Sequence, residues 1–458
     1  MLINNFSGQE LRDFRQIQKV SQAKLAKETL IVQAKISMFE LGKGELSDDE
    51  KTLISNFFSN SGKVEKIVKA KKKITRESSF SIDSLEVDRR RKKYTLSNKT
   101  ERYVKSLDDI YDRHLNNNKK FKAISLFSGC GGLCLGFSAA GVRIAGYIEK
   151  DKHISQIYRD NFSSTPQLAN DITSLSHKDI EQYKDSIGEV DIIIGGPPCQ
   201  GFSLSGKRDK SDARNKLFEN YLDFVAVFRP KIALLENVQL LTSMKDENGN
   251  YVKNVIIKKF QDLNYKITFF DVNAKDYGVP QSRARVFFLA IRNDVQSELS
   301  FPEKENENLT FGDACSDLEY LESGESSKID KLHFAVNHPP HVLEWLWHVP
   351  EGSSAHENVD ERLRPPSGYN TTYKRQVWNE EGSTVQTTFG MISGCRNVHP
   401  VATRSLTIRE AARIQSFPDK FVFNGKVGTI RTAIGNAVPP LLSYKIARYL
   451  INIIENKE

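Results

Sequence analysis

The chain lacks any run of about 18 apolar residues, and no charged-then-hydrophobic leader opens the sequence. We therefore expect a cytoplasmic protein without a membrane span, a secretory signal or a membrane partner. Cysteine is scarce as well, and the five residues are Cys130, Cys134, Cys199, Cys315 and Cys395. They form no C-x-x-C pair and no cluster with histidine at zinc spacing, so we expect neither a disulfide framework nor a structural metal.

Lys and Arg exceed Asp and Glu by 8 over the 458 residues, and this excess lies in one segment. Residues 61–120 hold 18 Lys and Arg but 9 Asp and Glu, a local charge of +9, so the other segments together are near −1. The runs Lys71–Lys73 and Arg89–Lys93 stand among Ser and Asn with few large apolar residues. This composition is typical of a solvated or partly helical connector, so we predict a basic linker over 61–118. Contact with a phosphate backbone is the alternative.

Before this segment, residues 8–58 show helical periodicity in short pieces. Leu11, Phe14 and Ile17 share one face of the first piece. Ser21 then offers an N-cap for a second helix. After a break at 29–32, a third helix runs to Gly42, which ends it as a C-cap would. We predict a small all-α domain over residues 1–60.

Two strings within this domain carry a resemblance. S-Q-A-K-L-A-K-E begins at Ser21, and V-Q-A-K-I-S-M-F-E-L-G-K-G begins at Val32. Together they resemble a helix-turn-helix of the Cro/phage-repressor type, which implies that the second helix enters the major groove of DNA. The resemblance makes Gln33, Lys35 and Ser37 candidate contacts to bases or phosphates, and Gln22 a contact to the DNA backbone. A small helical bundle that docks a protein is the alternative.

From Phe121 onward, apolar strands alternate with helical segments, which predicts an α/β fold with a doubly wound, mainly parallel sheet. The strand 121–127 runs into the glycine-rich turn 128–132 and a helix, and 142–149 is the next strand. The turn departs from the G-x-G-x-x-G spacing, which argues against NAD. Glu149, at the end of the second strand, is placed to accept hydrogen bonds from a ribose diol, and Asp171, after the third, is placed near an adenine.

The string G-G-P-P-C-Q-G-F-S, at 195–203, follows an apolar strand over 190–194. Pro197 and Pro198 each fix φ near about −65° and remove a donor, so Cys199 is presented in a set direction. The carboxyl end of a strand is also where a doubly wound sheet keeps its chemistry. We predict that Cys199 is a nucleophile; a small buried core residue is the alternative.

Several sequence blocks follow one another along the second part of the chain. They are F-S-G-C-G-G at 127–132, Glu149, Asn170-Asp171, G-P-P-C-Q-G-F-S at 196–203, E-N-V at 236–238, Q-S-R-A-R at 281–285, R-E-A-A-R-I-Q-S-F-P at 409–418 and G-N-A-V-P-P at 435–440. These blocks and their order resemble the DNA cytosine-5 methyltransferase family. The resemblance implies the S-adenosylmethionine-dependent methyltransferase fold, S-adenosylmethionine as methyl donor and double-stranded DNA as partner. It places the donor at Phe127, Gly129, Gly131, Glu149, Asp171, Pro198, Asn436 and Val438.

Cytosine carbon 5 is a poor nucleophile, so an enzyme must first add a nucleophile at carbon 6. The resemblance assigns that step to Cys199, whose thiolate the site must favour. Glu236, after a strand over 231–235, can neutralise N3 of the ring if it is protonated or shares a proton. The resemblance places Arg285 on the pyrimidine O2 and Arg283 in the surrounding polar network.

Gln281, Arg283 and Arg285 alternate along the next predicted strand, so they can share one face. The alternatives are a salt-bridged strand end for the arginines, and a surface carboxylate or N-cap for Glu236. The target base must leave the duplex before it reacts. We hypothesise that the basic, glycine-containing loop 204–215 closes over it.

The stretch 293–403 differs from its surroundings, because it holds all three tryptophans and many turn residues. We predict a smaller target-recognition domain here, and a catalytic domain over 119–292 and 404–458. The candidate reading segment is Tyr369–Gly394, with Thr371, Thr372, Lys374, Arg375 and the run 384–388. Histidines gather in this stretch too, but their spacings do not repeat, so we predict no metal site. The terminal helix 440–454 is expected to pack against the first strand region.

These features predict a sequence-specific DNA cytosine-5 methyltransferase of a restriction-modification system, with a cognate restriction endonuclease as functional partner. The N-terminal module either represses the protein's own transcription, as a dimer on operator DNA, or raises the affinity for substrate DNA. The alternatives are an RNA cytosine-5 methyltransferase and a DNA-binding regulator with an inactive catalytic domain. The helix-turn-helix reads duplex DNA, which argues against the RNA enzyme.

Overall fold

The computed structural model describes residues 6–17, 20–59, 80–198, 216–246 and 249–455. The chain forms two compact units, residues 1–78 and 79–458, and each is described by itself. Cys199 and the loop 204–215 lie outside the described residues, so what the sequence predicts for them stays a prediction. Within the described ranges, no helix is long and apolar enough to cross a lipid bilayer.

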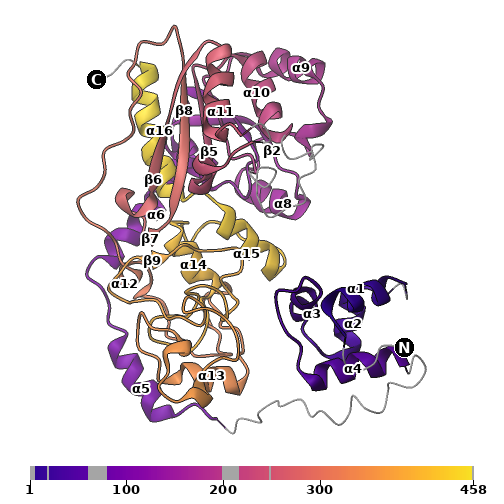
Figure 1. The fold of residues 1–458 in the computed structure, drawn as a ribbon. Helices are drawn as coiled ribbons and strands as arrows, with labels where there is room; N and C mark the ends of the chain where they lie inside the picture. The colour runs from indigo at the N-terminus through magenta and orange to yellow at the C-terminus, as the bar shows by residue number, and fades with distance from the viewer. Residues whose placement is uncertain (1–5, 18–19, 60–79, 199–215, 247–248, 456–458) are drawn as a thin grey trace. The chain divides into compact units, whose positions relative to one another are not determined.

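The described part of the first unit is helical and is drawn in indigo in Figure 1. Its helices are α1 (Gly8–Ile17), α2 (Gln22–Thr29), α3 (Gln33–Glu40) and α4 (Asp48–Ser59). Ser21 caps α2, because its side chain accepts a hydrogen bond from a backbone N–H of the first turn. Helices this short are marginal alone, and they are stabilised by a shared core that includes Leu11, Leu25, Ile36 and Ile54.

The second unit is built on a seven-stranded sheet in the order β3-β2-β1-β4-β5-β8-β6. Its strands are β1 (Phe121–Leu126), β2 (Val142–Ile148), β3 (Gln167–Ala169), β4 (Ile192–Gly195), β5 (Ile232–Val238), β6 (Tyr265–Asn273) and β8 (Ala284–Arg292). Neighbouring strands are parallel except where β8 pairs with β5 and β6. The predicted mainly parallel sheet is confirmed. Its strand order reverses between β1 and β4, where such sheets bind ligands.

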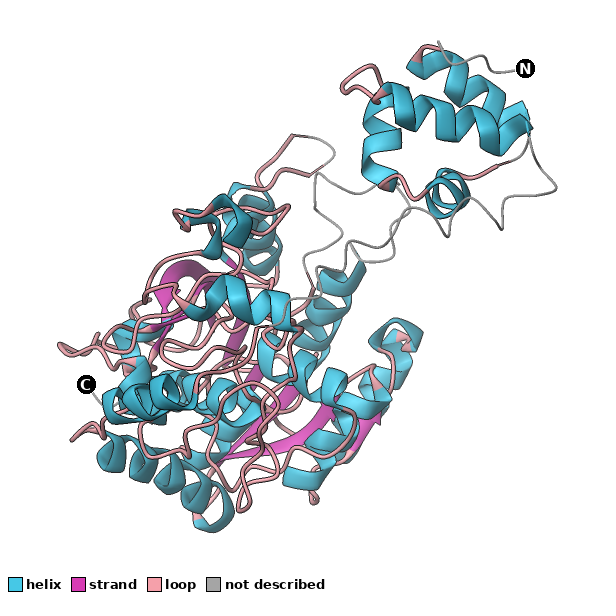
Figure 2. Ribbon diagram, turned by 90° about the horizontal axis from the view of Figure 1, so that it is seen from below, coloured by secondary structure: helices cyan, strands magenta, loops and turns pink. Residues whose placement is uncertain are grey.

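Residues along each strand alternate between two hydrophobic clusters, one on either face of the sheet. In β4, Ile192 and Ile194 enter one cluster and Ile193 enters the other. The first face is covered by α7 (Gly132–Ala139), α8 (Lys152–Asn161) and α16 (Pro440–Glu455), and the second by α9 (His177–Ile187), α10 (Lys216–Phe228) and α11 (Val252–Asp262). Figure 2 shows helices and strands from a second direction. The 3-10 turns η1 (Ile172–Ser174), η3 (Gln239–Ser243) and η4 (Ala274–Tyr277) follow β3, β5 and β6.

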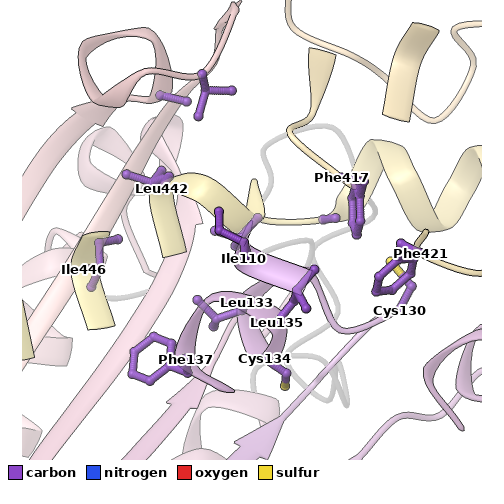
Figure 3. Packing of buried hydrophobic residues seen from close by; sticks show 14 of the residues in the cluster. Ile110, Cys130, Leu133, Cys134, Leu135, Phe137, Phe417, Phe421, Leu442 and Ile446 are labelled. Carbon is purple, nitrogen blue, oxygen red and sulfur yellow. The ribbon is translucent and has the colours of Figure 1, made fainter. Parts of the chain in front are cut away.

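The terminal helix α16 packs on α7, the helix that follows β1. A Cβ on Gly136 would lie 2.3 Å from the backbone nitrogen of Tyr444, so glycine is required for this close approach. Figure 3 shows Leu442 of α16 and Leu133 of α7 within the first cluster. The predicted terminal helix is confirmed. Because it returns to the β1 side of the sheet, it brings Asn436 there from the far end of the chain.

The segment predicted as a solvated or partly helical linker, 61–118, holds two packed helices in its described part, 80–118. They are α5 (Ser84–Lys93) and α6 (Thr100–Asn116). In α6, Tyr103, Leu107 and Ile110 recur on one helical face and are buried in the first cluster. A solvated connector is therefore wrong for residues 80–118, whereas the partly helical character is found there. Its composition is basic, but its few apolar residues have the spacing of an amphipathic helix.

The region 293–403 contains little regular structure. Its elements are α12 (Phe311–Cys315), α13 (Pro340–Trp347), the 3-10 turns η5 (Ala355–Glu357) and η6 (Glu361–Leu363), and β9 (Gly382–Ser383), which pairs with β7 (Gln281–Ser282). A small cluster that includes Trp345, Leu346, Ile392 and Val398 forms part of its interior. Helices α14 (Ile408–Ile414) and α15 (Val427–Asn436) follow. The region lies in the same compact unit as the sheet, and its status as a separate domain stays a prediction.

Candidate active site

A cavity of about 460 Å³ opens at the carboxyl ends of β1, β2, β4 and β5. Ten of the residues predicted for the site line it: Phe127, Gly129, Glu149, Asp171, Pro198, Glu236, Arg283, Arg285, Asn436 and Val438. Its size is within the range of small-molecule sites, and it stands where the strand order reverses. The fold therefore brings residues from both ends of the second unit to one place.

The glycine-rich turn after β1 forms one wall of the cavity. Three residues of this turn have a φ in the left-handed region: 56° at Phe127, 58° at Gly129 and 98° at Gly131. Such a φ strains a residue that carries a side chain, and strain of this kind collects at functional sites. Gly131 is absent from the described lining of the cavity. A Cβ on Gly131 would lie 2.5 Å from the ring of Phe162, so the packing of the turn itself requires glycine there.

Glu149, directly after β2, is held by the turn opposite it. Its carboxylate accepts hydrogen bonds from the backbone N–H groups of Gly129 at 2.9 Å and Asp151 at 2.8 Å. Burial raises the pKa of Glu149, and these hydrogen bonds oppose the rise. The carboxylate is thus fixed at the cavity wall, where it can accept hydrogen bonds from a diol.

Asp171 follows β3 and pairs with Lys150 at 2.7 Å. Its carboxylate also accepts from the backbone N–H of Thr173 at 3.0 Å and so caps η1. The hydrogen bond from Lys150 lowers the pKa of Asp171, which keeps its carboxylate ionised near neutral pH. Lys150 also lines the cavity and was not predicted. Its place directly after Glu149, at a strand end, is the signal that could have found it.

The end of β4 is held against β5 by an asparagine that was not predicted to have a role. Asn237 donates from its side-chain amide to the backbone carbonyl of Pro197 at 2.8 Å. A Cβ on Gly196 would lie 2.9 Å from Oε2 of Glu236, so glycine permits the two strand ends to approach. The chain therefore runs along the cavity wall up to Pro198, the residue before Cys199.

Glu236 lies inside β5, which runs to Val238 instead of ending at residue 235. Its Oε1 is 3.0 Å from Nε of Arg285, on the neighbouring strand β8. Burial raises the pKa of Glu236, although Arg285 and Arg283 oppose the rise. A carboxyl with a raised pKa at the wall of a cavity is suited to give or share a proton.

Arg283 and Gln281 have hydrogen-bond partners in later segments of the chain, whereas Arg285 pairs with Glu236. Arg283 is fully buried and donates to the backbone carbonyls of Val385 at 3.2 Å and Gly435 at 2.9 Å. Gln281 accepts from the backbone N–H of Val385 at 2.8 Å. Burial and the charge of Arg285 lower the pKa of Arg283. Of the three residues predicted to share one face, Arg283 and Arg285 line the cavity, and Gln281 is absent from the described lining.

The candidate reading segment, 369–394, contains exposed and buried polar residues. Arg375 is buried and donates to the carbonyls of Leu346, His399, Val401 and Ala402. It therefore stabilises the fold, and its prediction as a reading residue is wrong. Thr371 is exposed and Thr372 and Lys374 are half-buried, so these three stay candidates.

In the first unit, helix α3 presents most of the residues predicted to contact DNA. Gln33 and Lys35 are exposed, and Ser37 is half-buried. Lys35 pairs with Glu50 at 2.7 Å, an exposed contact that a phosphate group can replace.

Gln22 is engaged within the first unit. Its side-chain amide donates to Glu40 at 2.7 Å, and the same carboxylate pairs with Arg15 at 2.8 Å. Glu40 is buried, so this network joins α1, α2 and α3. The predicted contact of Gln22 with the DNA backbone therefore competes with a contact that holds the helices together.

The histidines and buried cysteines of the second unit serve its packing. Among the described residues, no group of three or more His, Cys, Asp or Glu side chains could hold a metal ion. His333 and His338 are buried and hydrogen-bond to Thr407 at 3.0 Å and Ser405 at 3.2 Å. Cys130 and Cys134 are buried free thiols whose pKa is raised by burial.

Known proteins resemble this chain over the second unit. The family model for C-5 cytosine-specific DNA methylase matches residues 121–452. The type II methyltransferase M.DdeI of Desulfomicrobium norvegicum is 36% identical over 376 residues, which covers 73% of this chain and 89% of that protein. The type II methyltransferase M1.HphI of Haemophilus parahaemolyticus is 38% identical over 339 residues, which covers 73% and 87%.

Solved structures agree with this match. A prophage-encoded DNA modification methyltransferase of E. coli has 26% identity and a TM-score of 0.59, over 73% of this chain and 100% of that one. The S. pombe Dnmt2 methyltransferase, with 17% identity and a TM-score of 0.50 over 74% and 99%, is similar in fold alone. The chain thus belongs to the C-5 cytosine-specific DNA methylase family, as a DNA cytosine-5 methyltransferase that uses S-adenosylmethionine as methyl donor.

Proposed function

We propose that this enzyme methylates cytosine within a specific duplex sequence through a transient covalent bond between Cys199 and carbon 6 of the base. The observation that supports this most is the pair of Glu236 and Arg285. It places a carboxyl with a raised pKa beside a guanidinium at the wall of the cavity, and Pro198, the residue before Cys199 in the sequence, lines the same cavity.

The cavity fits S-adenosylmethionine. Glu149 offers a carboxylate held by two backbone N–H groups, which suits a ribose diol, and Asp171 offers an ionised carboxylate near the adenine position. The assigned residues are Phe127, Gly129, Gly131, Glu149, Asp171, Pro198, Asn436 and Val438; Gly131 acts by shaping the turn. When bound, the donor supplies a methyl group on a positive sulfonium, which is electrophilic without a metal.

The first step is the addition of the Cys199 thiolate to carbon 6 of the extruded cytosine, which forms a carbon–sulfur bond. The electron pair of the ring double bond moves toward carbon 5, and negative charge develops at N3 and O2. Glu236 gives or shares its proton at N3, and Arg285 donates to O2. Burial raises the pKa of Glu236, which favours the protonated form that this step requires.

The second step restores the base. Carbon 5 takes the methyl group, and a base or a water molecule then accepts the carbon 5 proton while the sulfur leaves carbon 6. N3 returns its proton to Glu236, so one methyl group replaces one hydrogen and the thiolate is regenerated. Arg283 and Asn237 hold the cavity walls during these steps through their bonds to backbone carbonyls. They therefore act by position and exchange no proton with the substrate.

We propose that the region 293–403 reads the DNA sequence through the exposed part of Tyr369–Gly394, including Thr371. M.DdeI and M1.HphI are described as type II methyltransferases. By analogy, we propose that this enzyme belongs to a restriction-modification system and protects sites of a cognate endonuclease.

We propose that the first unit is a helix-turn-helix and that α3 binds DNA. The capped start of α2, the left-handed Leu30 that ends it, and the exposed Gln33 and Lys35 support this proposal. Self-repression as a dimer requires a palindromic footprint that differs from the methylated site and is lost on deletion of residues 1–60. A footprint confined to the methylated site would instead indicate that the unit aids substrate binding.

Bisulfite sequencing of DNA from cells that express the protein tests the catalytic proposal. We expect protected cytosines in one sequence motif for the wild type and none for Cys199→Ala. Cys395→Ser is the matched control, because it removes an exposed free thiol but keeps a donor beside Oγ1 of Thr371, which Sγ of Cys395 contacts at 3.6 Å, and it should give the wild-type pattern. Full protection by Cys199→Ala would refute the covalent mechanism.

A further inference from the structure

Two arginines meet inside the second unit at the carboxyl end of α13. Arg375 donates to the carbonyl of Leu346 at 2.9 Å, and Arg90 donates to the carbonyl of Trp347, so they cap the last carbonyls of the helix. Both also donate to Oγ1 of Thr403, at 2.9 Å from Arg375 and 2.6 Å from Arg90. We call Arg90, Arg375 and Thr403 the arginine joint.

The arginine joint is charged and closed to solvent. Arg90 is 8% exposed and Arg375 is 2% exposed. Glu322 supplies buried negative charge: its Oε2 accepts from the backbone N–H of Thr403 at 2.8 Å, and its Oε1 lies 3.9 Å from Nη1 of Arg90. The guanidinium of Arg90 also lies 4.0 Å from the ring centroid of Trp347. Loss of either guanidinium would leave buried polar groups without partners, which is costly.

The two arginines come from different parts of the chain. Arg375 lies in the candidate reading segment, 369–394, whereas Arg90 lies in α5, before the residues 121–452 that match the family model. The joint therefore connects the reading segment to a helix that the matched part of the family does not supply.

Residues 80–116, which we call the strap, continue this contact toward the sheet. The ring of Phe80 lies 5.4 Å from that of Trp347, and Tyr94 donates to the carbonyl of Cys315 at 2.9 Å. Further along, Leu107 and Ile110 of α6 are buried in the cluster on one face of the sheet. Figure 3 includes Ile110 among the residues of that cluster. The strap thus spans from the region 293–403 to the catalytic core.

We propose that Arg90 is a positioning residue for DNA recognition. Through Thr403 and the end of α13, it fixes the reading segment relative to the catalytic cavity, and being buried it makes no contact with DNA. The inference rests on the proposal that 369–394 reads DNA. It predicts that loss of Arg90 loosens sequence discrimination while the binding of S-adenosylmethionine is unchanged.

The test uses the full chain with Arg90→Ala, and Arg89→Ala as the matched control. Arg89 is one position away on the same helix, and its side chain is 74% exposed. kcat and KM are measured on the target duplex and on duplexes with one base pair changed. We expect Arg90→Ala to raise the KM for target DNA. It should also lower the ratio of kcat/KM for the target duplex to kcat/KM for the changed duplex by about tenfold, because one mismatched base pair costs about 1–3 kcal/mol of binding free energy. Arg89→Ala should leave every constant within about twofold, as for a surface charge.

Arg90→Lys sharpens the result, because it keeps the charge but cannot reach two acceptors with a planar fork. Relative to Arg90→Ala, Arg90→Lys should restore part of the discrimination between the target duplex and the changed duplex. A role in stability alone would lower kcat equally on both duplexes and leave the ratio unchanged, which overturns the proposal.

Two more variants keep the inference testable if Arg90→Ala does not fold. Thr403→Val removes the shared hydroxyl with little change of shape and should also lower the ratio. Lys374→Ala tests the reading segment itself. If Lys374→Ala lowers the ratio but the Arg90 and Thr403 variants do not, the positioning role is wrong and the reading proposal stands. If none lowers it, both are wrong.

Discussion

Two glutamates of the second unit pair with arginines: Glu410 is buried in the packing around α14, and Glu236 is half-buried at the cavity wall. Their surroundings shift their pKa in opposite directions. Glu410, on α14, accepts from both Nη atoms of Arg404, at 2.8 Å and 2.7 Å, and from the backbone N–H of Thr407 at 2.9 Å. Burial alone would raise the pKa of Glu410, but the charge of Arg404 outweighs it and holds the pKa well below its usual range. Glu236 contacts Nε of Arg285 at 3.0 Å, and burial raises its pKa.

The difference shows that burial does not by itself make a carboxyl reactive. Glu410 has its oxygens saturated by donors, so its charged form is favoured and its role is structural. Among the described residues, Arg285 is the one hydrogen-bond or ion-pair partner of the Glu236 side chain, which leaves oxygen lone pairs free toward the cavity. The number of donors around the carboxylate separates the structural pair from the pair that we propose to be catalytic.

The largest expected effect is on stability, in Glu410→Gln. This change leaves Arg404 as a buried charge without its partner, so the free energy of unfolding should fall by about 3–5 kcal/mol. Urea unfolding followed by circular dichroism measures it. Glu381→Gln, which removes a partly exposed partner of Lys275, is the control and should cost less than about 1 kcal/mol. Equal losses in the two variants would contradict the structural role of Glu410.

Glu236→Gln should affect the rate and leave stability intact. Without the carboxyl proton at N3, we expect kcat to fall by about 100-fold or more, as for loss of a general acid. The melting temperature should not fall, because the change removes a carboxyl whose charged form burial disfavours. Methyl-transfer kinetics and thermal unfolding of the same sample measure both. A large loss of stability with a normal kcat would reverse the assignment of the two pairs.

The pH dependence of stability should differ in sign between the pairs. The folded pKa of Glu410 lies below the unfolded value of about 4.3, so its contribution is full above that pH and is lost as the pH falls below it. The folded pKa of Glu236 is raised, so its ionisation weakens the fold as pH rises above about 4.3. The stability gap between wild type and Glu410→Gln should therefore narrow in acid. The advantage of Glu236→Gln should grow as the pH rises from about 4.3 through the raised folded pKa of Glu236, and should be constant above it.

The exposed pair of Lys35 and Glu50 extends the comparison to the surface and should give the smallest effect. Lys35→Ala should change stability by less than about 1 kcal/mol and leave methyl transfer unchanged. If α3 binds DNA, Lys35→Ala should weaken DNA binding by the first unit. The slope of the logarithm of the binding constant against the logarithm of the salt concentration should decrease in magnitude by about 1. Lys24→Ala, on the exposed face of α2, is the control. Equal weakening by both variants in salt titrations of DNA binding would contradict the assignment of α3.

The turns around the cavity could be predicted from the sequence because their geometry is local. The ends of apolar runs place Phe127 and Pro198 beside glycines or prolines and Glu149 at a change to charged residues, and the structure finds all three at the cavity. The predicted end of β5, at residue 235, was less accurate, because the strand runs to Val238. Residues 236–238 stay in the strand because they pair with β8, which contributes Arg285, and such partners are not visible in a local pattern.

The packing of basic side chains could not be predicted from residue type. Arg90 stands in a run of five basic residues, yet its guanidinium is buried against Trp347 and Thr403, 257 and 313 positions away in the sequence. Arg375 stands among polar turn residues and is buried as well. A solvated arginine and an arginine that caps a helix contribute equally to the composition of a segment. Only the tertiary contacts distinguish the two.

The bond between Cys199 and carbon 6 is tested most directly by trapping it on a target duplex that carries 5-fluorocytosine. Fluorine at carbon 5 cannot leave as the proton does, so the sulfur remains attached after methyl transfer. With S-adenosylmethionine present, we predict a complex that survives denaturation and maps by peptide mass spectrometry to Cys199, and no such complex with Cys199→Ala. A wild-type enzyme that methylates ordinary cytosine but forms no adduct, or forms one at another residue, would contradict this mechanism.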